Sequence, residues 1–452
     1  MHYELTGLPI IKALLKSRWP QFIVFALMLA GFIFAILAGL IGTPVGSHNF
    51  GIVFTWIAWW AILILVAVPF FGRGWCAVCP IPLPGEWMQR GGLLEPTGAK
   101  HTLSGTGASP LRRWPNKLRN IWMQNASFTL IALFSSVILT TPQVSSVVLG
   151  AMIFVAIGLS MVFERRAFCR YLCPVGGFIG LYAQLAPLEL RVKNKRVCAT
   201  CVDKPCYNGS AIGYGCPWDV APTGLSKNTY CGLCMECLRT CPNNNIAVNA
   251  RPFSADLAKP STRMDEAFKA FIMLGAAMIY AGVLLGPWGS LKLAAYSVGS
   301  LAWFVYAAVF LALIFGVLPG FFSLSVKGGQ MLSRSTAPFK ATFAAFATAL
   351  IPLGLMFWVA FSLSFVLTNA SYILVALSDP FGWSWNLFGT AGIPWQPYLS
   401  VALVPMQTLA LVGGLLWTLR TAQKIALERG ITSAPVAIFS AVATVIMLGL
   451  LL

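Results

Sequence analysis

The sequence predicts a mainly α-helical membrane protein, a polytopic bundle of about nine spans with one polar α+β module inserted into it. Two observations predict this class. Of the 452 residues, 58% are hydrophobic and only 10% are charged, whereas soluble chains carry about 25% charged residues. The chain also holds a series of apolar runs of roughly 20 residues, the length that crosses a hydrocarbon core of ~30 Å.

The apolar runs divide the chain into three predicted domains. Residues 1–187 form an N-terminal membrane domain with four spans, and residues 267–452 form a C-terminal membrane domain with five. Residues 188–266 lie between them, are polar and Cys-rich, and hold no run that could span. We therefore predict a soluble module there. The nine predicted spans are 19–42, 52–71, 120–140, 146–163, 267–287, 298–323, 341–367, 396–419 and 432–452.

The basic residues predict which side of the membrane each loop occupies. With the N-terminus inside, the inner segments hold 30 of the 31 Lys and Arg residues, counting Lys269 where the fifth span begins, and only Lys292 lies outside. Inner loops carry such an excess in membrane proteins. We therefore expect a protein of the inner (cytoplasmic) membrane whose N-terminus and soluble module are cytoplasmic and whose C-terminus is outside. The net charge of +18 has the same origin, so we expect contact with lipid and none with nucleic acid.

All twelve cysteines lie between residues 76 and 241, within the predicted inner segments. A disulfide framework would place them on the oxidising side, so reduced thiolates that bind metal are the better interpretation. The run Cys231–Pro242 has the spacing C-x2-C-x2-C-x3-C-P. Bacterial ferredoxins use this spacing to hold one cubane with three thiolates and to lead a fourth thiolate to the other cluster. The alternative is a zinc site, which usually pairs two C-x2-C units across a longer gap.

A second Cys motif lies upstream and has the spacing C-x2-C-x4-C-x9-C-P. It is longer than the regular run before its third and fourth cysteines. Two-cluster ferredoxins exchange their fourth ligands between motifs, and the same exchange here predicts two [4Fe-4S] clusters. The first would be held by Cys198, Cys201, Cys206 and Cys241, and the second by Cys231, Cys234, Cys237 and Cys216. A module with one cluster and an altered first half is the alternative.

The four remaining cysteines form two pairs, Cys76 with Cys79 and Cys169 with Cys173. Each pair follows a predicted span and has an Arg upstream, an aromatic residue directly before the first Cys, and Pro directly after the second. The matched contexts predict an internal repeat of a two-span hairpin, which would bring the pairs together at the inner membrane surface. Four thiolates there suit a metal or a third cluster. Redox-active dithiols and inert buried cysteines are the alternatives.

Paired Cys-Pro motifs at inner helix ends, followed by a two-cluster module, resemble the membrane polyferredoxin proteins of the NapH, NosR and CcoG type. The resemblance covers about residues 50–250. Cys169, Cys173 and Pro174 match the motif of that group, whereas the first pair has one residue fewer between its cysteines. The resemblance implies quinol-linked electron delivery to a redox enzyme or its maturation, or copper reduction during oxidase assembly. Residues 267–452 lie outside it.

We therefore predict a membrane-bound iron–sulfur protein that relays electrons between the quinone pool and a partner redox enzyme, as a subunit of a quinol-linked oxidoreductase complex. Its predicted cofactors are two [4Fe-4S] clusters, a third cluster or metal at the surface Cys pairs, and quinone. Its predicted partners are membrane lipid and the other redox subunits. The alternative function is a maturation factor that reduces copper with electrons from the ferredoxin-like module. A membrane scaffold with structural clusters is the third hypothesis.

Overall fold

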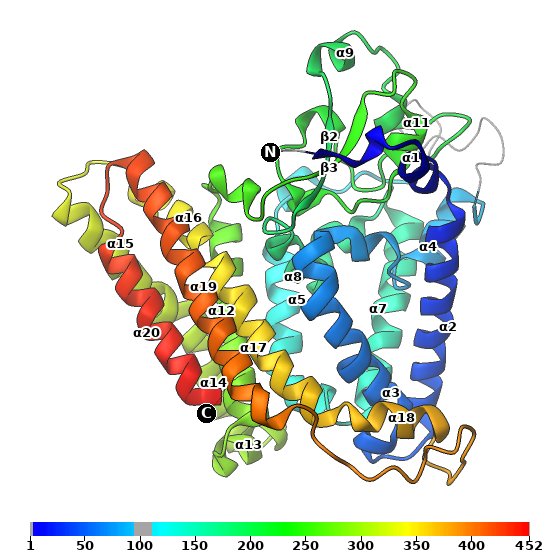
Figure 1. Cartoon of the computed structure of the whole chain (residues 1–452), viewed down its shortest axis with the longest axis vertical. Coiled ribbons are helices and arrows are strands. Elements are labelled where there is room, and N and C mark those ends of the chain that lie inside the picture. The colour runs from blue at the N-terminus through cyan, green and yellow to red at the C-terminus, as the bar shows by residue number, and fades with distance from the viewer. Residues whose placement is uncertain (1–2, 95–110, 452) are drawn as a thin grey trace. The chain divides into compact units, whose positions relative to one another are not determined.

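The computed structural model describes residues 3–94 and 111–451 and is mainly helical (Figure 1). Within these residues, eight helices are long and apolar enough to cross a membrane. They are Trp19–Ile41, Phe50–Ala77, Pro142–Val162, Met264–Leu285, Leu301–Leu332, Phe339–Asn369, Ser400–Arg429 and Ala434–Leu451. The prediction of a multi-pass helical membrane protein is confirmed, whereas the identity of the membrane and the orientation of the termini stay predictions.

The third predicted span, 120–140, is helical but interrupted. Helices α5 (Trp122–Leu133) and α6 (Ser135–Ile138) lie on either side of Phe134. The φ of −96° and ψ of 9° at Phe134 depart from helical values. Neither helix alone has the roughly 20 residues that a span requires. The total of nine spans therefore stays a prediction.

The chain divides into two compact units. Unit 1 comprises residues 1–33, 66–124 and 149–256, and unit 2 comprises residues 34–65, 125–148 and 257–452. Helices such as α2 (Trp19–Ile41) and α7 (Pro142–Val162) contribute residues to both units. The three predicted domains stay a prediction. Part of the predicted N-terminal domain, residues 1–2 and 95–110, lies outside the described residues.

Unit 1 contains a small antiparallel sheet beside the Cys-rich segment. Strand β3 (Ile246–Ala250) lies between β1 (Tyr3–Glu4) and β2 (Leu188–Val192). Because side chains alternate along a strand, Ile246 and Val248 both point into a core that includes Leu190, Leu233 and Leu238. Short helices complete this segment: α9 (Lys195–Ala199), α10 (Pro205–Asn208) and α11 (Glu236–Thr240). Its likeness to a ferredoxin stays a prediction.

Four further short helical segments belong to unit 1. They are α1 (Pro9–Lys16), α4 (Leu83–Arg90), α8 (Pro174–Tyr182) and a π-helical turn, Phe168–Leu172. The span before the first pair begins with α3 (Phe50–Ile52) and also widens into a π-helix, Ile62–Phe71. Pro69 lies inside it and has no amide hydrogen to close a regular helical turn. π-Helical turns often occur at functional sites.

Unit 2 is a bundle of helices. These are α12 (Met264–Tyr280), α13 (Gly289–Tyr296), α14 (Leu301–Ala312), α15 (Leu318–Leu332), α16 (Phe339–Ala349), α17 (Ile351–Asn369), α18 (Ser371–Ser378), α19 (Ser400–Arg429) and α20 (Ala434–Leu451). Helix α19 approaches α17 closely because Gly414 has no side chain, and a Cβ there would lie 2.6 Å from Met356 Cβ. The amide of Leu353, in the first turn of α17, donates to Thr418 Oγ1 of α19 (3.1 Å). Backbone groups within a bilayer must find such partners inside the protein.

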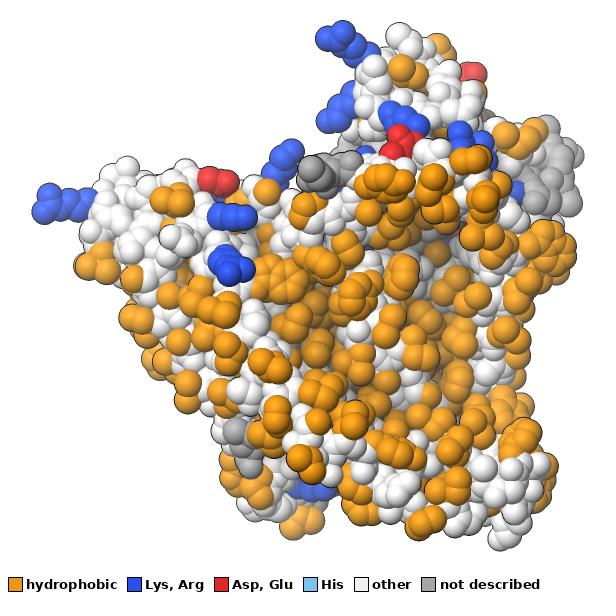
Figure 2. All heavy atoms as spheres, viewed as in Figure 1, with side chains coloured by type: hydrophobic (Ala, Val, Ile, Leu, Met, Phe, Trp, Pro, Cys, Tyr) orange, Lys and Arg blue, Asp and Glu red, His pale blue; other side chains and the backbone are white. Residues whose placement is uncertain are grey.

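The surface matches a membrane protein. Figure 2 shows hydrophobic side chains over the visible faces of the helices, and basic side chains around the Cys-rich segment of unit 1. In unit 2, the loop after α15 contacts the loop after α19, since the amide of Thr432 donates to Ser333 Oγ (2.8 Å). Arg334 and Arg429 belong to these loops and the helix ends beside them. The basic residues of both loops therefore lie at one end of the unit 2 bundle.

Candidate metal centres

The two Cys pairs at the ends of membrane helices lie together in unit 1. Cys76 is at the end of the span Phe50–Ala77, and Cys169 lies in the π-helical turn Phe168–Leu172. Cys173 caps α8, where its Sγ accepts a hydrogen bond from the amide of Gly176 (3.2 Å). Burial raises the pKa of the Cys169 thiol, and the neighbouring thiols of Cys173, Cys79 and Cys76 raise it further. The structure thus brings all four cysteines into one neighbourhood, here called the membrane-surface site.

Two buried arginines join the halves of the membrane-surface site. Arg73 and Arg166 each lie three residues before the first Cys of their own pair. Arg166 Nη1 donates to the carbonyl of Cys76 (2.7 Å), and Arg73 Nη2 points back to the carbonyl of Cys169 (3.4 Å). Each arginine therefore contacts the first Cys of the other pair. This exchange is what an internal repeat that packs against itself would produce.

The two arginines differ in their acidic partners. Arg166 forms an ion pair with Glu86, in which Nε and Nη2 donate to Oε2 (2.9 and 2.5 Å). Arg73 donates only to carbonyl oxygens, those of Thr229 (2.5 Å), Gly176 (2.9 Å) and Cys169. Arg73 is 2% exposed, and no carboxylate of the described residues pairs with it.

The Cys231–Pro242 motif forms a tight loop before α11. Leu233 and Met235 have φ values of 49° and 62°, which non-glycine residues adopt rarely. This conformation turns the amides of Leu233 and Glu236 toward sulfur atoms, those of Cys231 and Cys234. Hydrogen bonds to sulfur are a feature that tunes iron–sulfur clusters. The loop is therefore shaped to present thiolates to a metal group.

Cys216 reaches this loop because its segment docks on the residues around Cys169. The amide of Arg166 donates to the carbonyl of Pro217 (2.9 Å), and Arg165 Nη1 donates to the carbonyl of Cys216 (2.9 Å). Arg170 donates to the carbonyls of Trp218 and Asp219. Burial raises the pKa of the Cys237 thiol, and Cys234, Cys231, Cys216 and Cys206 raise it further. The four cysteines predicted for the second cluster are thus neighbours.

The four cysteines predicted for the first cluster line one cavity, together with Pro205, Pro222 and Ile246. Asn245 connects the two ends of this set. Its amide donates to Cys241 Sγ (3.3 Å), and its side-chain Nδ2 donates to Cys198 Sγ (3.1 Å). Burial raises the pKa of Cys206 to about 11, and Cys241, Cys198 and Cys201 are the next causes. A shared hollow lined by thiols and N–H donors fits a bound cluster.

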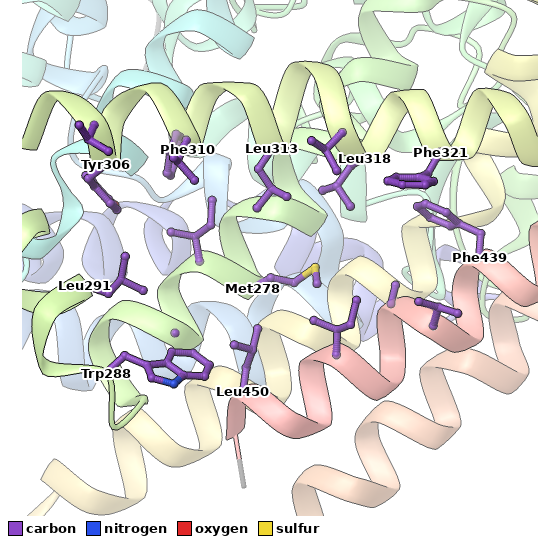
Figure 3. A pocket seen from close by; sticks show the side chains of 18 of the residues that line it. Met278, Trp288, Leu291, Tyr306, Phe310, Leu313, Leu318, Phe321, Phe439 and Leu450 are labelled. Atoms are coloured by element: carbon purple, nitrogen blue, oxygen red, sulfur yellow. The ribbon is translucent and has the colours of Figure 1, made fainter.

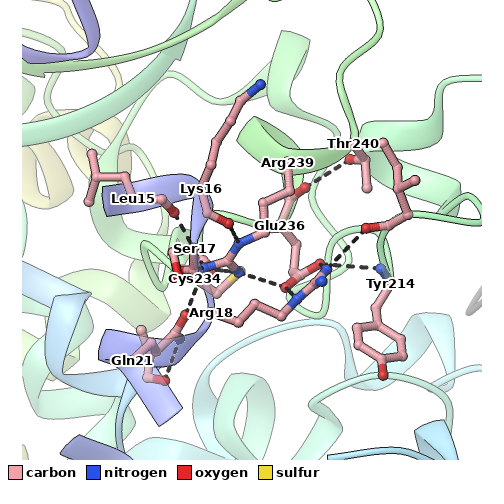
Figure 4. A network of polar contacts seen from close by, with 12 residues as sticks. Leu15, Lys16, Ser17, Arg18, Gln21, Tyr214, Cys234, Glu236, Arg239 and Thr240 are labelled. Atoms are coloured by element: carbon pink, nitrogen blue, oxygen red, sulfur yellow. Dashed lines mark hydrogen bonds and ion pairs between the residues drawn. The ribbon is translucent and has the colours of Figure 1, made fainter. Parts of the chain in front are cut away.

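A network of ion pairs holds the Cys231–Pro242 motif against the N-terminal helices (Figure 4). Arg18 Nη2 donates to Glu236 Oε2 (2.9 Å), and Arg239 Nη1 donates to Glu236 Oε1 (2.7 Å). Arg239 also reaches the carbonyls of Lys16 and Ser17 and the side chain of Gln21. These contacts bind α1 and the start of α2 to the loop that carries Cys234.

The described residues hold no group of three or more His, Cys, Asp or Glu with the arrangement of a single-ion site. A cubane distributes its four thiolates over different irons, so its ligands do not need that arrangement.

A large cavity in unit 2 has a different character. It has a volume of about 1370 Å³ and is lined by residues that include Met278, Trp288, Tyr306, Phe310 and Phe439 (Figure 3). Its lining contains no acidic or basic side chain. The cavity therefore suits hydrocarbon chains.

Comparison with known families bears directly on the membrane-surface site. A family described as "4Fe-4S binding domain" matches residues 52–96 and 146–196. Each matched stretch contains one Cys pair and the arginine before it. Fold and site together therefore define a multi-pass membrane protein with a 4Fe-4S binding domain.

Two curated proteins share similarity with parts of this chain. "Putative electron transport protein YccM" of Escherichia coli is 29% identical over 144 residues, which cover 28% of this chain and 36% of that protein. The uncharacterized protein MJ0749 of Methanocaldococcus jannaschii is 29% identical over 85 residues, or 18% of this chain and 30% of that protein. The chain thus matches about a third of the length of each relative. No solved structure matches the chain. The predicted resemblance to membrane 4Fe-4S electron-transfer proteins is confirmed.

The cysteines were predicted from their spacing, but several other residues of the site were not. Arg73 and Arg166 were noted only as part of the repeated context, although their identical position before each pair was a usable signal. No sequence motif marks the positions of Glu86, Asn245 and Trp218. Their roles depend on contacts between distant parts of the chain, such as that of Asn245 with Cys198, 47 residues earlier.

Proposed function

We propose that this chain is a membrane electron relay that carries single electrons between the quinone pool and a partner redox enzyme through three cysteine sites. One observation carries the proposal. The membrane-surface site gathers two Cys pairs, both of which fall within matches to a 4Fe-4S binding domain. This site adjoins the second-cluster cysteines, because Arg166 interacts electrostatically with both Cys169 and Cys234.

Each cysteine set would hold one group. Cys76, Cys79, Cys169 and Cys173 would hold a third cluster, and the two sets of the polar segment would hold the two cubanes with exchanged fourth ligands. A bound [4Fe-4S] cluster supplies a one-electron carrier. The surrounding protein excludes water from the thiolates, and its N–H groups donate hydrogen bonds to them. The backbone amide of Gly176 donates to Cys173, the backbone amide of Asn245 donates to Cys241, and the Asn245 side chain donates to Cys198.

The order of the sites suggests the route. The membrane-surface site shares arginine contacts with the second set, since Arg73 contacts the carbonyls of Cys169 and Thr229, the latter two residues before Cys231. The second set in turn adjoins the first, because the Cys206 thiol raises the pKa of the Cys237 thiol. Oxidation of one quinol releases two electrons and two protons, so two successive single-electron transfers would follow this route for each quinol.

The basic residues support an inner membrane location with the polar segment in the cytoplasm. In unit 2, the loops after α15 and α19 share one end of the bundle and carry Arg334 and Arg429, as the positive-inside rule expects of cytoplasmic loops. The extra helices of unit 2 would contact lipid and other subunits of the complex.

Iron counting and electron paramagnetic resonance at low temperature test the number of clusters. Three cubanes predict about twelve irons per chain, and the double variant Cys76→Ser/Cys169→Ser should lose about four of them while keeping the signals of the other two clusters. A matched control is Cys198→Ser, which should spare the membrane-surface signal. About eight irons in the unaltered protein, unchanged in the double variant, would remove the third cluster from the proposal.

Quinol analogues test the relay. The purified protein should reduce its clusters on mixing with a quinol analogue, and the double variant should do so far more slowly. Stoichiometric copper at the membrane-surface site, with no response to quinol or quinone, would instead favour the maturation factor.

A further inference from the structure

Arg73 is a buried cation that has no acidic partner among the described residues. Its guanidinium donates to three carbonyl oxygens and lies 4.3 Å from the centroid of the Trp218 ring. A buried charge is costly unless an opposite charge compensates it. Carbonyl oxygens and an aromatic face supply only partial negative charge. The guanidinium therefore requires an anion nearby that the described carboxylates do not supply.

The internal repeat shows where the missing carboxylate would be. When the two Cys pairs are aligned on their Cys-Pro dipeptides, Glu86 lies six residues after Pro80, and Gly180 lies six residues after Pro174. Glu86 is the partner of Arg166. A Cβ on Gly180 would lie 3.2 Å from Arg73 Nη1, so Gly180 is next to the arginine that has no acid among the described residues. The repeat thus retains the arginine in both halves and the acid in only one.

The anions within reach of Arg73 are the thiolates of two cysteine sets. A Cβ on Gly176 would lie 3.3 Å from both Arg73 Nη2 and Cys173 Cβ, so the guanidinium lies beside Cys173. The hydrogen bonds of Arg73 to the carbonyls of Cys169 and Thr229 also place the guanidinium beside the membrane-surface site and the second cysteine set. The Trp218 ring lies beside both arginines, since its centroid is also 5.9 Å from Arg166 Cζ.

We infer that Arg73 is a fixed counter-charge shared by the membrane-surface site and the neighbouring second cluster, and that it raises the reduction potential of both. The inference rests on the proposed function. Each cluster gains one electron when it is reduced, and the donor is a quinol or an artificial one-electron reductant. The added negative charge is stabilised by a cation that water does not screen. Arg73 is thus a positioning residue that acts on the clusters without binding them.

Redox titration followed by electron paramagnetic resonance tests this inference on the full-length protein in detergent. Arg73→Gln removes the charge and keeps a donor, so the potentials of the membrane-surface and second clusters should both shift downward. The first cluster, whose cysteines have no contact with Arg73 among the described residues, should shift less. Arg73→Lys keeps the charge, and its potentials should lie close to those of the unaltered protein. Arg196→Gln removes an exposed cation beside Cys198 and should leave the membrane-surface potential unchanged.

The outcomes distinguish an effect of the Arg73 charge from effects of hydrogen bonding and packing. Equal shifts in Arg73→Gln and Arg73→Lys would overturn the inference, because hydrogen bonding and not charge would then set the potentials. If Arg73→Gln lacks iron while Arg73→Lys retains the full amount, the counter-charge role is supported. If both lose iron equally, packing is the cause and the inference fails. Absence of a third cluster in the unaltered protein would defeat the proposed function, whereas normal clusters with no shift in Arg73→Gln would defeat this inference only.

Discussion

Arg166 donates a hydrogen bond of 2.7 Å from Nη1 to the carbonyl of Cys76, a residue 90 positions earlier in the chain. The contact joins the two halves of the internal repeat, because Arg166 precedes the second Cys pair and Cys76 belongs to the first. Arg73 makes the reverse connection to Cys169. Hydrogen bonds from the two arginines to backbone carbonyls thus join the halves of the membrane-surface site, in addition to any group that its thiols bind.

Glu86 should be essential to the stability of this region. It pairs with Arg166 and Arg90 and is 3% exposed. Replacement by Gln would leave the buried guanidinium of Arg166 and the partly buried one of Arg90 without their carboxylate, and removal of one partner of a buried ion pair costs about 3–5 kcal/mol. We expect a clear fall in the thermal unfolding temperature in detergent.

Glu164→Gln is the matched control for Glu86. Glu164 pairs with Arg113, whose side chain is 64% exposed, and such surface pairs contribute about 0–1 kcal/mol. If the two variants unfolded at the same temperature, the buried pair would have no special role.

Gly232 should tolerate no side chain. A Cβ there would lie 2.1 Å from Trp218 Nε1, and Trp218 is fully buried. Gly232→Ala would force the indole or the Cys231–Cys234 loop to move, and overpacking of this kind costs about 1–3 kcal/mol. We expect an altered resonance spectrum of the second cluster. Gly224→Ala in the same segment meets no atom within 4 Å and should leave all spectra unchanged.

Asn245 should act selectively on the first cluster. Its backbone amide donates to Cys241 and its side-chain Nδ2 donates to Cys198. Asn245→Ala removes only the second of these bonds, and loss of a hydrogen bond to sulfur lowers the potential of an iron–sulfur cluster. Asn245→Ala should therefore lower the first-cluster potential and leave the membrane-surface cluster unaffected. Asn243→Ala, at an exposed position of the same turn, serves as the control. An equal response of all clusters would show that the variant disturbs the fold in general.

The loops of unit 2 should lie on opposite sides of the membrane. A protease site inserted after Gly299 should be cut from outside intact cells, and one inserted after Ser335 should be cut only in inverted vesicles. The second loop carries Arg334, and the segment before Gly299 carries only Lys292. Cleavage of both sites from the same side would contradict the predicted topology.

The class of the protein and the identity of its cysteines could be predicted from the sequence because both are local properties. Long apolar runs form helices wherever a bilayer surrounds them, and seven residues from Cys231 to Cys237 are enough to define a cubane loop. The interruption at Phe134 could not be predicted, since the residues around it are as apolar as those of an unbroken span.

By itself, the sequence determined that the chain crosses a membrane and that its twelve cysteines lie in closely spaced motifs between residues 76 and 241, because composition and spacing carry that information. Only the tertiary structure decided which groups surround the thiols. Arg73 and Asn245 contact cysteines that are distant in the chain, and Trp218 and Glu86 contact the arginines beside the Cys pairs. Among the described residues, Arg73 has Gly180 where the other half of the repeat has Glu86. Charge compensation in a buried site depends on distances through space, which residue spacing along the chain does not specify.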